Sequence, residues 1–338
     1  MIFFIIVLGL LCLWKIKYEQ RGDYLNVYRT NSIKGIFIIL IFFSHITNDY
    51  VSFGGELAVP YYMLKKILGQ CVVCLFLFYS GYAMLHKLTT EEDYCKNIPT
   101  RRILTTLLRF DAAIVLFALY GMYKGTKYSI KRMVLTFLGW NGIGNSNWYI
   151  FCILCLYLFT YIAFTVFSNK KKAVTAVTLL TIIYMGIVNK YQGSWWWDTA
   201  LCYSLGMWFY IYKEKIHEII DENFKTWITS FFISLAMFTA CYLNKGNVWA
   251  YQVMVISFTC MVVIFTMHIA ISNKILAWCG ENLFELYILQ RIPMIILKDI
   301  GLAEVNGYVY VIVCLILTIV ISVVFKRCIS RHICFHKR

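Results

Sequence analysis

Residues 32–50 read SIKGIFIILIFFSHITNDY, an apolar run that begins beside Lys34 and is interrupted by His45. Further long apolar runs occur at 68–85 and 307–325. About 20 apolar residues in a helix cross roughly 30 Å of hydrocarbon, because each residue advances the helix by about 1.5 Å. The composition agrees, since 61% of the 338 residues are hydrophobic, only 14% are charged and the mean hydropathy is +0.69. A soluble domain has about 25% charged residues, so the sequence predicts an all-α polytopic membrane protein.

Apolar runs along the rest of the chain predict about eleven hydrophobic helices. The first of them lacks the basic start and the small-residue cleavage site of a signal peptide, so we expect it to remain as a membrane anchor. Residues 129–140 are amphipathic, and we expect them to lie as a short helix on the outer membrane surface. The predicted membrane helices are 2–14, 33–52, 68–86, 103–121, 148–167, 173–189, 195–212, 226–243, 249–272, 275–297 and 307–325.

The chain is strongly basic, with 32 Lys+Arg against 17 Asp+Glu and a net charge of +15. Its basic residues stand in short segments between apolar runs, where they meet lipid headgroups and set orientation. The sequence carries no nucleic-acid-binding motif, so the lipid bilayer is the expected partner of this charge. Most of the charge falls on one side if residues 15–32 are cytoplasmic, which predicts a cytoplasmic C-terminus and an extracytoplasmic N-terminus.

Thirteen cysteines lie mostly inside apolar runs, where cysteine acts as a small hydrophobic residue. The CxxC pairs Cys71/Cys74 and Cys152/Cys155 fall within predicted helices, so packing is favoured over a metal or redox role. The basic tail contains a set of residues for which metal binding, lipid attachment and no role all stay open. This set is Cys328, His332, Cys334 and His336.

The first candidate functional site is His45 in the middle to outer half of its predicted helix, about 16 Å from Lys34 along the axis. Ser44 adjoins His45, and Asn48 and Asp49 follow on the same helical face. Ionisable groups are costly inside a bilayer and therefore mark candidate functional sites. A neutral histidine oriented by Asp49 is suited to take a proton from an alcohol. The alternative, weighted equally on physical grounds, is a histidine that only hydrogen-bonds between helices.

The second candidate is a basic cluster at the start of the fourth predicted helix. Lys96, Arg101 and Arg102 lead into this helix, and Arg109 lies two turns further on, on the same face as Arg102. Arginine pairs well with phosphate oxygens, so the cluster predicts a site for a phosphorylated cytoplasmic ligand. An ordinary positive-inside cluster explains Arg101 and Arg102 but explains Arg109 less well. Asp111 is either the partner of Arg109 or an independent polar group.

The predicted helix 275–297 contains the third set of costly polar residues, Asn282, Glu285, Tyr287, Gln290 and Arg291. The carboxylate and the guanidinium of this set are not spaced to meet on one helix face. We therefore expect each of them to face other helices or water.

Aromatic and polar residues gather where two further helices begin. Asn145, Asn147 and Trp148 open the helix 148–167, and a run of tryptophans at 195–197 followed by Asp198 opens the helix 195–212. Aromatic residues at such positions are first of all anchors in the membrane interface. Stacking against a sugar is the alternative.

Taken together, these segments resemble the membrane-bound acyltransferase-3 family, whose members O-acylate sugars and other extracytoplasmic acceptors. SIKGIFIILIFFSH, residues 32–45, is similar to the first core helix of that family, in which a basic residue, ten intervening residues and a histidine recur. Many relatives have arginine where this chain has Lys34, and the charge is kept. Three other segments also resemble the family: FLFYSGYAM (76–84), which contains Ser80, NWYIFCILCLYL (147–158) and ELYILQRIP (285–293). In the segment ELYILQRIP, relatives often have a histidine where this chain has Gln290.

The resemblance implies a ten-helix core over 29–325, preceded by an anchor and linker at 1–28 and followed by a basic tail at 326–338. It implies transfer of an acyl group, with acetyl favoured, from cytoplasmic acyl-CoA to a hydroxyl of an extracytoplasmic glycan or cell-surface polymer. The expected location is the cell membrane of a bacterium. The co-substrate is acyl-CoA, most simply acetyl-CoA, and no metal is required.

The resemblance also suggests roles for the candidate residues. His45 is expected to act as general base or, as the less favoured alternative, as a transient acyl carrier, with Asp49 orienting it and Lys34 positioning the CoA side. The expected acyl-CoA site consists of Lys96, Arg101, Arg102 and Arg109. The expected tunnel or acceptor site consists of Ser80, Asn147, Trp148, Glu285, Tyr287, Gln290 and Arg291.

Two other classes of function stay open at this point. A transporter that exports a polysaccharide intermediate or a small anion would line its pathway with the same polar residues. A non-catalytic scaffold or sensor would keep the fold for binding alone. Dependence on acyl-CoA separates the enzyme from both.

Overall fold

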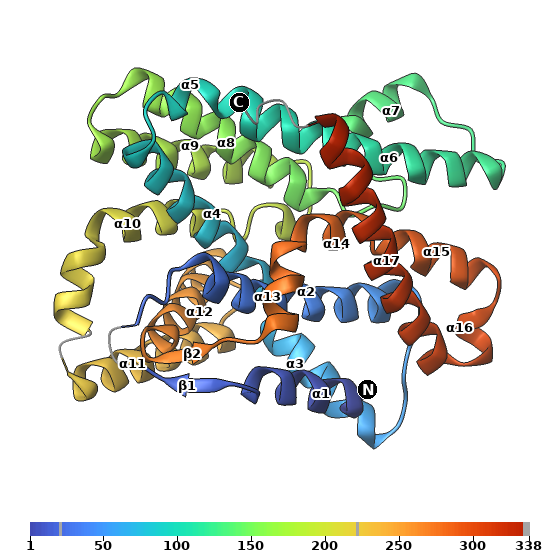
Figure 1. Cartoon of the computed structure of the whole chain (residues 1–338), viewed down its shortest axis with the longest axis horizontal. Helices are drawn as coiled ribbons and strands as arrows, with labels where there is room; N and C mark the ends of the chain where they lie inside the picture. The colour runs from blue at the N-terminus through green and yellow to red at the C-terminus, as the bar shows by residue number, and fades with distance from the viewer. Residues whose placement is uncertain (20–21, 221–222, 334–338) are drawn as a thin grey trace.

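The computed structural model describes residues 1–19, 22–220 and 223–333 (Figure 1). These residues are mostly helical, and they contain one two-stranded antiparallel sheet in which β1 (Ile16–Tyr18) pairs with β2 (Ile269–Ile271). In the described residues, eight helices are long and apolar enough to cross a membrane. The prediction of an all-α polytopic membrane bundle is confirmed.

The helices follow one another along the chain with short connections. Their bounds are α1 (Ile2–Leu13), α2 (Val27–Asp49), η1 (Glu56–Ala58), α3 (Val59–Leu68), α4 (Cys71–Thr90), α5 (Tyr94–Ile98), η2 (Pro99–Leu104), α6 (Thr105–Tyr123), α7 (Ile130–Phe137), α8 (Trp148–Val166), α9 (Lys170–Val188), η3 (Ser194–Trp196), α10 (Leu201–Ile220), α11 (Phe224–Leu243), α12 (Val248–His268), α13 (Lys274–Glu281), α14 (Leu283–Leu289), α15 (Arg291–Asp299), α16 (Leu302–Val305) and α17 (Gly307–Ile333).

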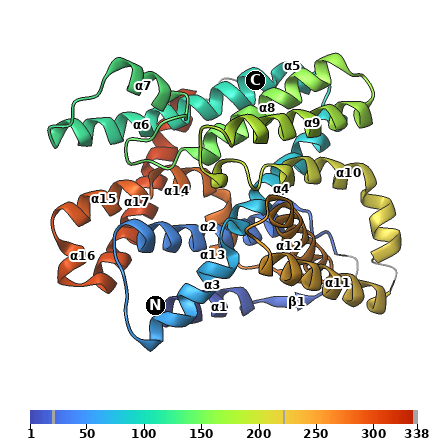
Figure 2. The ribbon, with the colours of Figure 1, turned by 180° about the vertical axis from the view of Figure 1, so that it is seen from behind.

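Helix α2 lies in the interior of this bundle. In Figures 1 and 2 a layer of α6, α8 and α9 lies above it, and α1, β1 and α3 lie below it. Helix α2 packs against α4, α13, α14 and α15. In its most apolar stretch 61% of the residues are buried, as in α4, whereas the corresponding share in α11 is 17%. The fold therefore places the helix that carries His45 at its centre and leaves helices such as α11 to face lipid.

Helices α2 and α13 touch through a reciprocal pair of glycines. A Cβ on Gly35 would lie 1.9 Å from the carbonyl oxygen of Leu276, and a Cβ on Gly280 would lie 1.9 Å from that of Asn31. Small residues let helix backbones approach closely in membrane proteins, where dispersion contacts hold helices together. The pair fixes the position of α2 relative to the segment that begins with α13.

A second reciprocal pair joins α4 to α10. A Cβ on Gly81 would lie 1.9 Å from the carbonyl oxygen of Tyr203, and a Cβ on Gly206 would lie 2.0 Å from that of Phe78. The glycine of the FLFYSGYAM segment therefore has a packing role. It holds α4, and with it Ser80, against α10.

We expect Gly35→Ala to lower the free energy of unfolding by about 1–3 kcal/mol, because the added methyl group overlaps the backbone of α13. The measurement is the thermal unfolding midpoint of the purified protein in detergent. Gly186→Ala in α9 is the matched control, since no atom lies within 4 Å of a Cβ built there. Equal midpoints for the two variants would contradict the close contact between α2 and α13.

The predicted helix 275–297 is wrong as a single span. It is three short helices, α13, α14 and α15, separated at Asn282 and Gln290. Asn282 leaves the helical conformation (φ −101°, ψ 17°), and its side-chain amide donates to the Trp278 carbonyl. Pro293 lacks the N–H that would continue a helix through Leu289. Gln290 keeps right-handed helical angles (φ −56°, ψ −29°), so the sharper break is at Asn282, between α13 and α14.

Two other predicted segments are placed as follows. The amphipathic stretch 129–140 contains the helix α7, as predicted, and Ser129 caps it by accepting from the Arg132 N–H. The stretch 195–212 is not one helix, since η3 precedes a turn and α10 begins only at Leu201.

The cysteines make no disulfide within the described residues, where twelve of them are free. Cys71, Cys74 and Cys152 are buried among apolar side chains, as the packing interpretation expects. Of the tail set, Cys328 is exposed. Cys334 and His336 lie outside the described residues.

Candidate active site

His45 lines a cavity of about 640 Å³, called here the His45 chamber. Ile41, Ser44, His45 and Asn48 all border it, because positions i, i+3, i+4 and i+7 share one face of α2. The Nδ1 atom of His45 is closed to water and has no hydrogen-bond partner. The other ring nitrogen, Nε2, is accessible and makes no hydrogen bond within the described residues. Nε2 is therefore the ring nitrogen available to a molecule in the chamber. The remaining wall is Asp49, Gly69, Gln70, Val72, Val73, Asn145, Ser146, Asn147, Trp148, Trp195, Tyr287 and Arg291.

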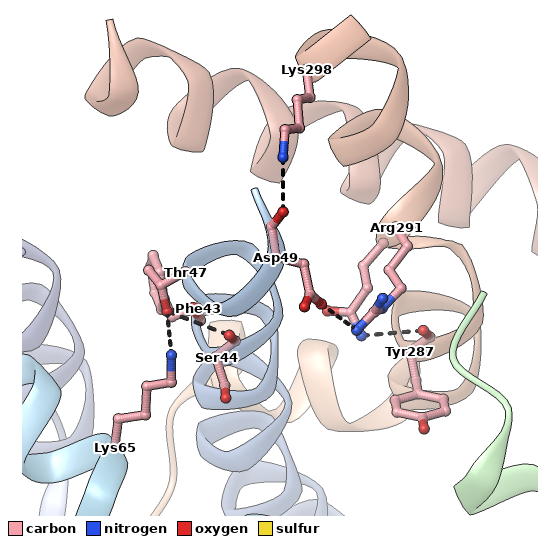
Figure 3. Close-up of polar contacts among 9 residues, drawn as sticks. Phe43, Ser44, Thr47, Asp49, Lys65, Tyr287, Arg291 and Lys298 are labelled. Atoms are coloured by element: carbon pink, nitrogen blue, oxygen red, sulfur yellow. Dashed lines mark hydrogen bonds and ion pairs between the residues drawn. The ribbon is translucent and has the colours of Figure 1, made fainter. Parts of the chain in front are cut away.

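Asp49 pairs with Arg291 at one side of this chamber (Figure 3). The Arg291 guanidinium donates to Oδ2 of Asp49 at 2.7 Å, and Lys298 Nζ donates to the backbone carbonyl of Asp49 at 3.0 Å. The expected contact between Asp49 and His45 is therefore not present in the described residues. The two opposite charges neutralise each other and tie the end of α2 to α15.

Helix α3 forms hydrogen bonds to the other side of α2. Lys65 Nζ donates to Oγ1 of Thr47 at 2.9 Å, as Figure 3 shows, and the Tyr61 hydroxyl donates to the Phe43 carbonyl at 2.8 Å. Thr47 also contacts the Tyr61 hydroxyl at 2.8 Å. These bonds fix the C-terminal half of α2, which carries His45, against α3.

A second cavity of about 260 Å³, called here the basic cavity, contains two of the predicted cations. Lys34 and Arg102 both line it, although they come from α2 and from η2. Lys34 has no ion pair or hydrogen bond within the described residues, and Arg102 Nε donates to the Tyr94 hydroxyl at 2.6 Å. Glu281, the one acidic side chain among the described residues of the lining, lies 3.6 Å from Lys326. The basic cavity is therefore suited to an anion. Its other lining residues include Ser80, Phe76, Tyr149 and Phe284.

The other predicted acyl-CoA residues line neither cavity. Lys96 is exposed and pairs with Asp93 at 2.7 Å, and Arg101 is also exposed. Arg109 pairs with Glu285 and lies over the Phe284 ring, 4.6 Å from its centre. Glu285, rather than Asp111, is thus the carboxylate that meets Arg109.

A row of aromatic rings separates the two cavities. Phe76 and Tyr149 border the basic cavity, and Tyr287 and His45 border the His45 chamber. The ring centres of Phe76 and Tyr149 are 6.2 Å apart, those of Tyr149 and Tyr287 are 5.6 Å apart, and those of Tyr287 and His45 are 6.2 Å apart. On α14, Phe284 lines the basic cavity, and Tyr287, one helical turn later, lines the His45 chamber. We call this row the aromatic partition.

The predicted tunnel or acceptor residues divide among these places. Asn147, Trp148, Tyr287 and Arg291 line the His45 chamber, and Ser80 lines the basic cavity. Glu285 is in the ion pair with Arg109, and Gln290 is buried with its Nε2 donating to the Tyr287 carbonyl at 3.2 Å. Sequence reasoning assigned no role to Ser146 or Gln70, which lie in the wall of the chamber. The polar run Asn145–Asn147 directly before an apolar helix was the available signal.

Comparison with known proteins adds the family. The model of the acyltransferase-3 family, described as an acyltransferase domain, matches residues 27–327, which contain both cavities and the aromatic partition. No curated protein and no solved structure matches the chain. Because the matched region is most of its length, the chain belongs to the acyltransferase-3 family.

Proposed function

We propose that this membrane acyltransferase moves an acyl group, most simply acetyl, from cytoplasmic acyl-CoA to a hydroxyl of an extracytoplasmic glycan or cell-surface polymer. One observation carries the proposal. An imidazole nitrogen is open to a polar chamber, and a cavity lined by two cations lies on the other side of a single row of aromatic rings.

The basic cavity is the proposed donor site. Lys34 and Arg102 bring two positive charges to one small cavity, and charged hydrogen bonds to phosphate oxygens are among the stronger ones in proteins. We place the phosphates of CoA at these residues. The pantetheine arm then carries the thioester toward the aromatic partition and His45.

The His45 chamber is the proposed acceptor site. Its wall combines neutral amide side chains, including Asn48 and Gln70, with the indole rings of Trp148 and Trp195. Amides bond sugar hydroxyls, and indole rings offer an apolar face to a sugar ring. Because Asp49 and Arg291 neutralise each other, the described residues of the wall carry no uncompensated acidic charge.

The proposed reaction uses His45 as general base. Nε2 takes the proton of the acceptor hydroxyl as its oxygen attacks the thioester carbonyl carbon. The C–S bond then breaks, and the CoA sulfur takes up the proton from the imidazolium. The products are the acylated hydroxyl and free CoA, and His45 returns to its neutral form.

The sidedness of the proposal rests on charge. The basic cavity is lined by Arg102 from the basic segment 87–102, and by Glu281, which lies 3.6 Å from Lys326 in the C-terminal part of α17. The positive-inside rule predicts a cytoplasmic location for both basic segments. The His45 chamber, on the other side of the aromatic partition, then lies nearer the extracytoplasmic surface. In this orientation, acyl-CoA reaches His45 from the cytoplasmic side, and the acceptor reaches it from the extracytoplasmic side.

The test is a transfer assay with the full-length protein purified in detergent. Labelled acetyl-CoA is supplied with and without a mixture of cell-surface glycans. We expect slow release of CoA without glycan, and faster release with the label moved to glycan hydroxyls. A folded protein that leaves acetyl-CoA untouched under both conditions would overturn the proposal.

A further inference from the structure

Buried polar atoms that have no hydrogen-bond partner among the described residues gather in the wall of the His45 chamber. Four of them belong to residues outside α2, and each carries a hydrogen that it can donate: Asn145 Nδ2, Ser146 Oγ, Tyr287 Oη and Arg291 Nε. Burying a donor without a partner costs about 1–3 kcal/mol, and native structures pair most such groups. Several unpaired donors in the wall of one chamber therefore indicate a ligand that accepts hydrogen bonds there.

The donors are held in place by the fold. Oδ1 of Asn145 accepts from the Ile143 N–H at 2.9 Å, which leaves its Nδ2 as the unused group. Asn147 Nδ2 donates to the Gly139 carbonyl at 2.9 Å and fixes the same loop. Gly144 supplies the left-handed conformation (φ 108°) that the turn before Asn145 requires.

The third donor stands beside the base. The Tyr287 ring centre lies 6.2 Å from that of His45, and the Tyr149 ring supports it from the side of the basic cavity. Tyr287, Asn145 and Ser146 are 3%, 6% and 6% exposed. Hydrogen bonds are stronger in such surroundings than in water.

These four donors suit an oxyanion, whereas the amides of Asn48 and Gln70 elsewhere in the wall suit the sugar hydroxyls of the acceptor. A sugar hydroxyl both donates and accepts, so it is recognised by mixed groups. An oxyanion only accepts, so it needs donors. The wall supplies these donors, and Asp49, the one carboxylate among its described residues, is already paired with Arg291.

We infer that Asn145, Ser146 and Tyr287 form an oxyanion hole for the acyl group that approaches His45. The inference rests on the proposed function. When the acceptor oxygen bonds to the carbonyl carbon, the carbonyl electron pair moves to its oxygen, which these donors stabilise. When the pair returns, the C–S bond breaks and the CoA sulfur leaves with the proton that His45 held. Arg291, through Nε, adds positive charge to the same wall.

The experiment compares three single-group variants. Asn145→Asp keeps the oxygen that accepts from Ile143 and removes the donor, Tyr287→Phe removes one hydroxyl, and Ser146→Ala removes another. Ser322→Ala is the matched control, because Ser322 in α17 is also buried with no partner in the described part of the chain and lines neither cavity. For each purified protein we measure the kcat of acetyl-CoA hydrolysis without acceptor, and the kcat and acceptor KM of transfer.

We expect Asn145→Asp and Tyr287→Phe to lower both kcat values by about 10²–10³-fold, the usual cost of one oxyanion donor. The acceptor KM should change by less than about twofold, because the oxyanion exists only in the reacting state. Ser146→Ala should act in the same direction, and Ser322→Ala should match the wild type. Thermal unfolding of each variant separates loss of the donor from loss of the fold, and Tyr287→Phe serves as the test if Asn145→Asp does not fold.

Contrary results separate the inference from the proposed function. A raised acceptor KM with unchanged hydrolysis would assign the donors to the acceptor and overturn the oxyanion hole. Full activity in all three variants would also overturn it, while loss of activity in His45→Ala would leave the proposed function standing. A folded wild-type protein without turnover of acetyl-CoA would overturn both.

Discussion

Replacing His45 with alanine is expected to lower acyl transfer by about 10²–10⁴-fold, the usual contribution of a positioned general base. The reason is local. His45 lines the chamber, and its neighbours Phe42, Phe43 and Ile46 are buried in an apolar cluster that holds this part of α2. The thermal unfolding midpoint of the variant should therefore stay close to that of the wild type. The measurement is the rate of label transfer from acetyl-CoA to glycan.

His86→Ala is the control for this variant. His86 is exposed on α4 and lines neither cavity, so its replacement should leave the rate unchanged. A His45→Ala protein that transfers acetyl at the wild-type rate would show that the base is elsewhere.

Removing the charges of the basic cavity is expected to raise the KM for acyl-CoA. Lys34→Gln and Arg102→Gln each delete a cation that lines the cavity. A hydrogen bond to a charged group contributes about 1.5–3 kcal/mol, so each variant should raise this KM by roughly 10- to 100-fold. The KM for the acceptor should change little. Initial rates at varied acetyl-CoA concentration measure the effect.

Arg101→Gln is the matched control for the donor site. Arg101 adjoins Arg102 in the sequence but is exposed and lines neither cavity. Its KM should remain within about threefold of the wild type, as expected for an exposed charge. Equal effects at Arg101 and Arg102 would indicate general attraction by a basic surface and would remove the cavity from the donor site.

The fold class and the central helix could be predicted from the sequence, because both depend on local patterns. A long apolar run specifies a membrane helix, and the helical period places Ser44, His45 and Asn48 on one face of α2. The structure has these three residues on one wall of a chamber. Local patterns also predicted the short helix α7, since Lys131 and Arg132 stand among apolar residues within a segment of eight.

Partners could not be predicted in the same way, because they depend on which helices pack together. Arg109 meets Glu285, and Asp49 meets Arg291, across long stretches of chain that hydropathy does not connect. The break of 275–297 into three helices was hidden because its apolar residues continue through Asn282 and past Pro293. Only the packed structure shows that this segment brings Tyr287 next to His45.

The grouping of the basic residues also required the structure. By sequence, Lys96, Arg101, Arg102 and Arg109 form one cluster. In the structure Arg102 alone among them faces the basic cavity, and it is joined there by Lys34 from a different helix. A charge count identifies a basic surface, whereas a site requires charges that converge.

The central claim is that one imidazole serves a donor from one membrane face and an acceptor from the other. The most direct measurement uses proteoliposomes of known orientation, with labelled acetyl-CoA sealed on the side of the C-terminus and the glycan acceptor supplied only on the opposite side. We expect the label to appear on the acceptor across the intact bilayer, and His45→Ala vesicles to show none above background. Label on the acceptor only when both substrates share one compartment would contradict the account.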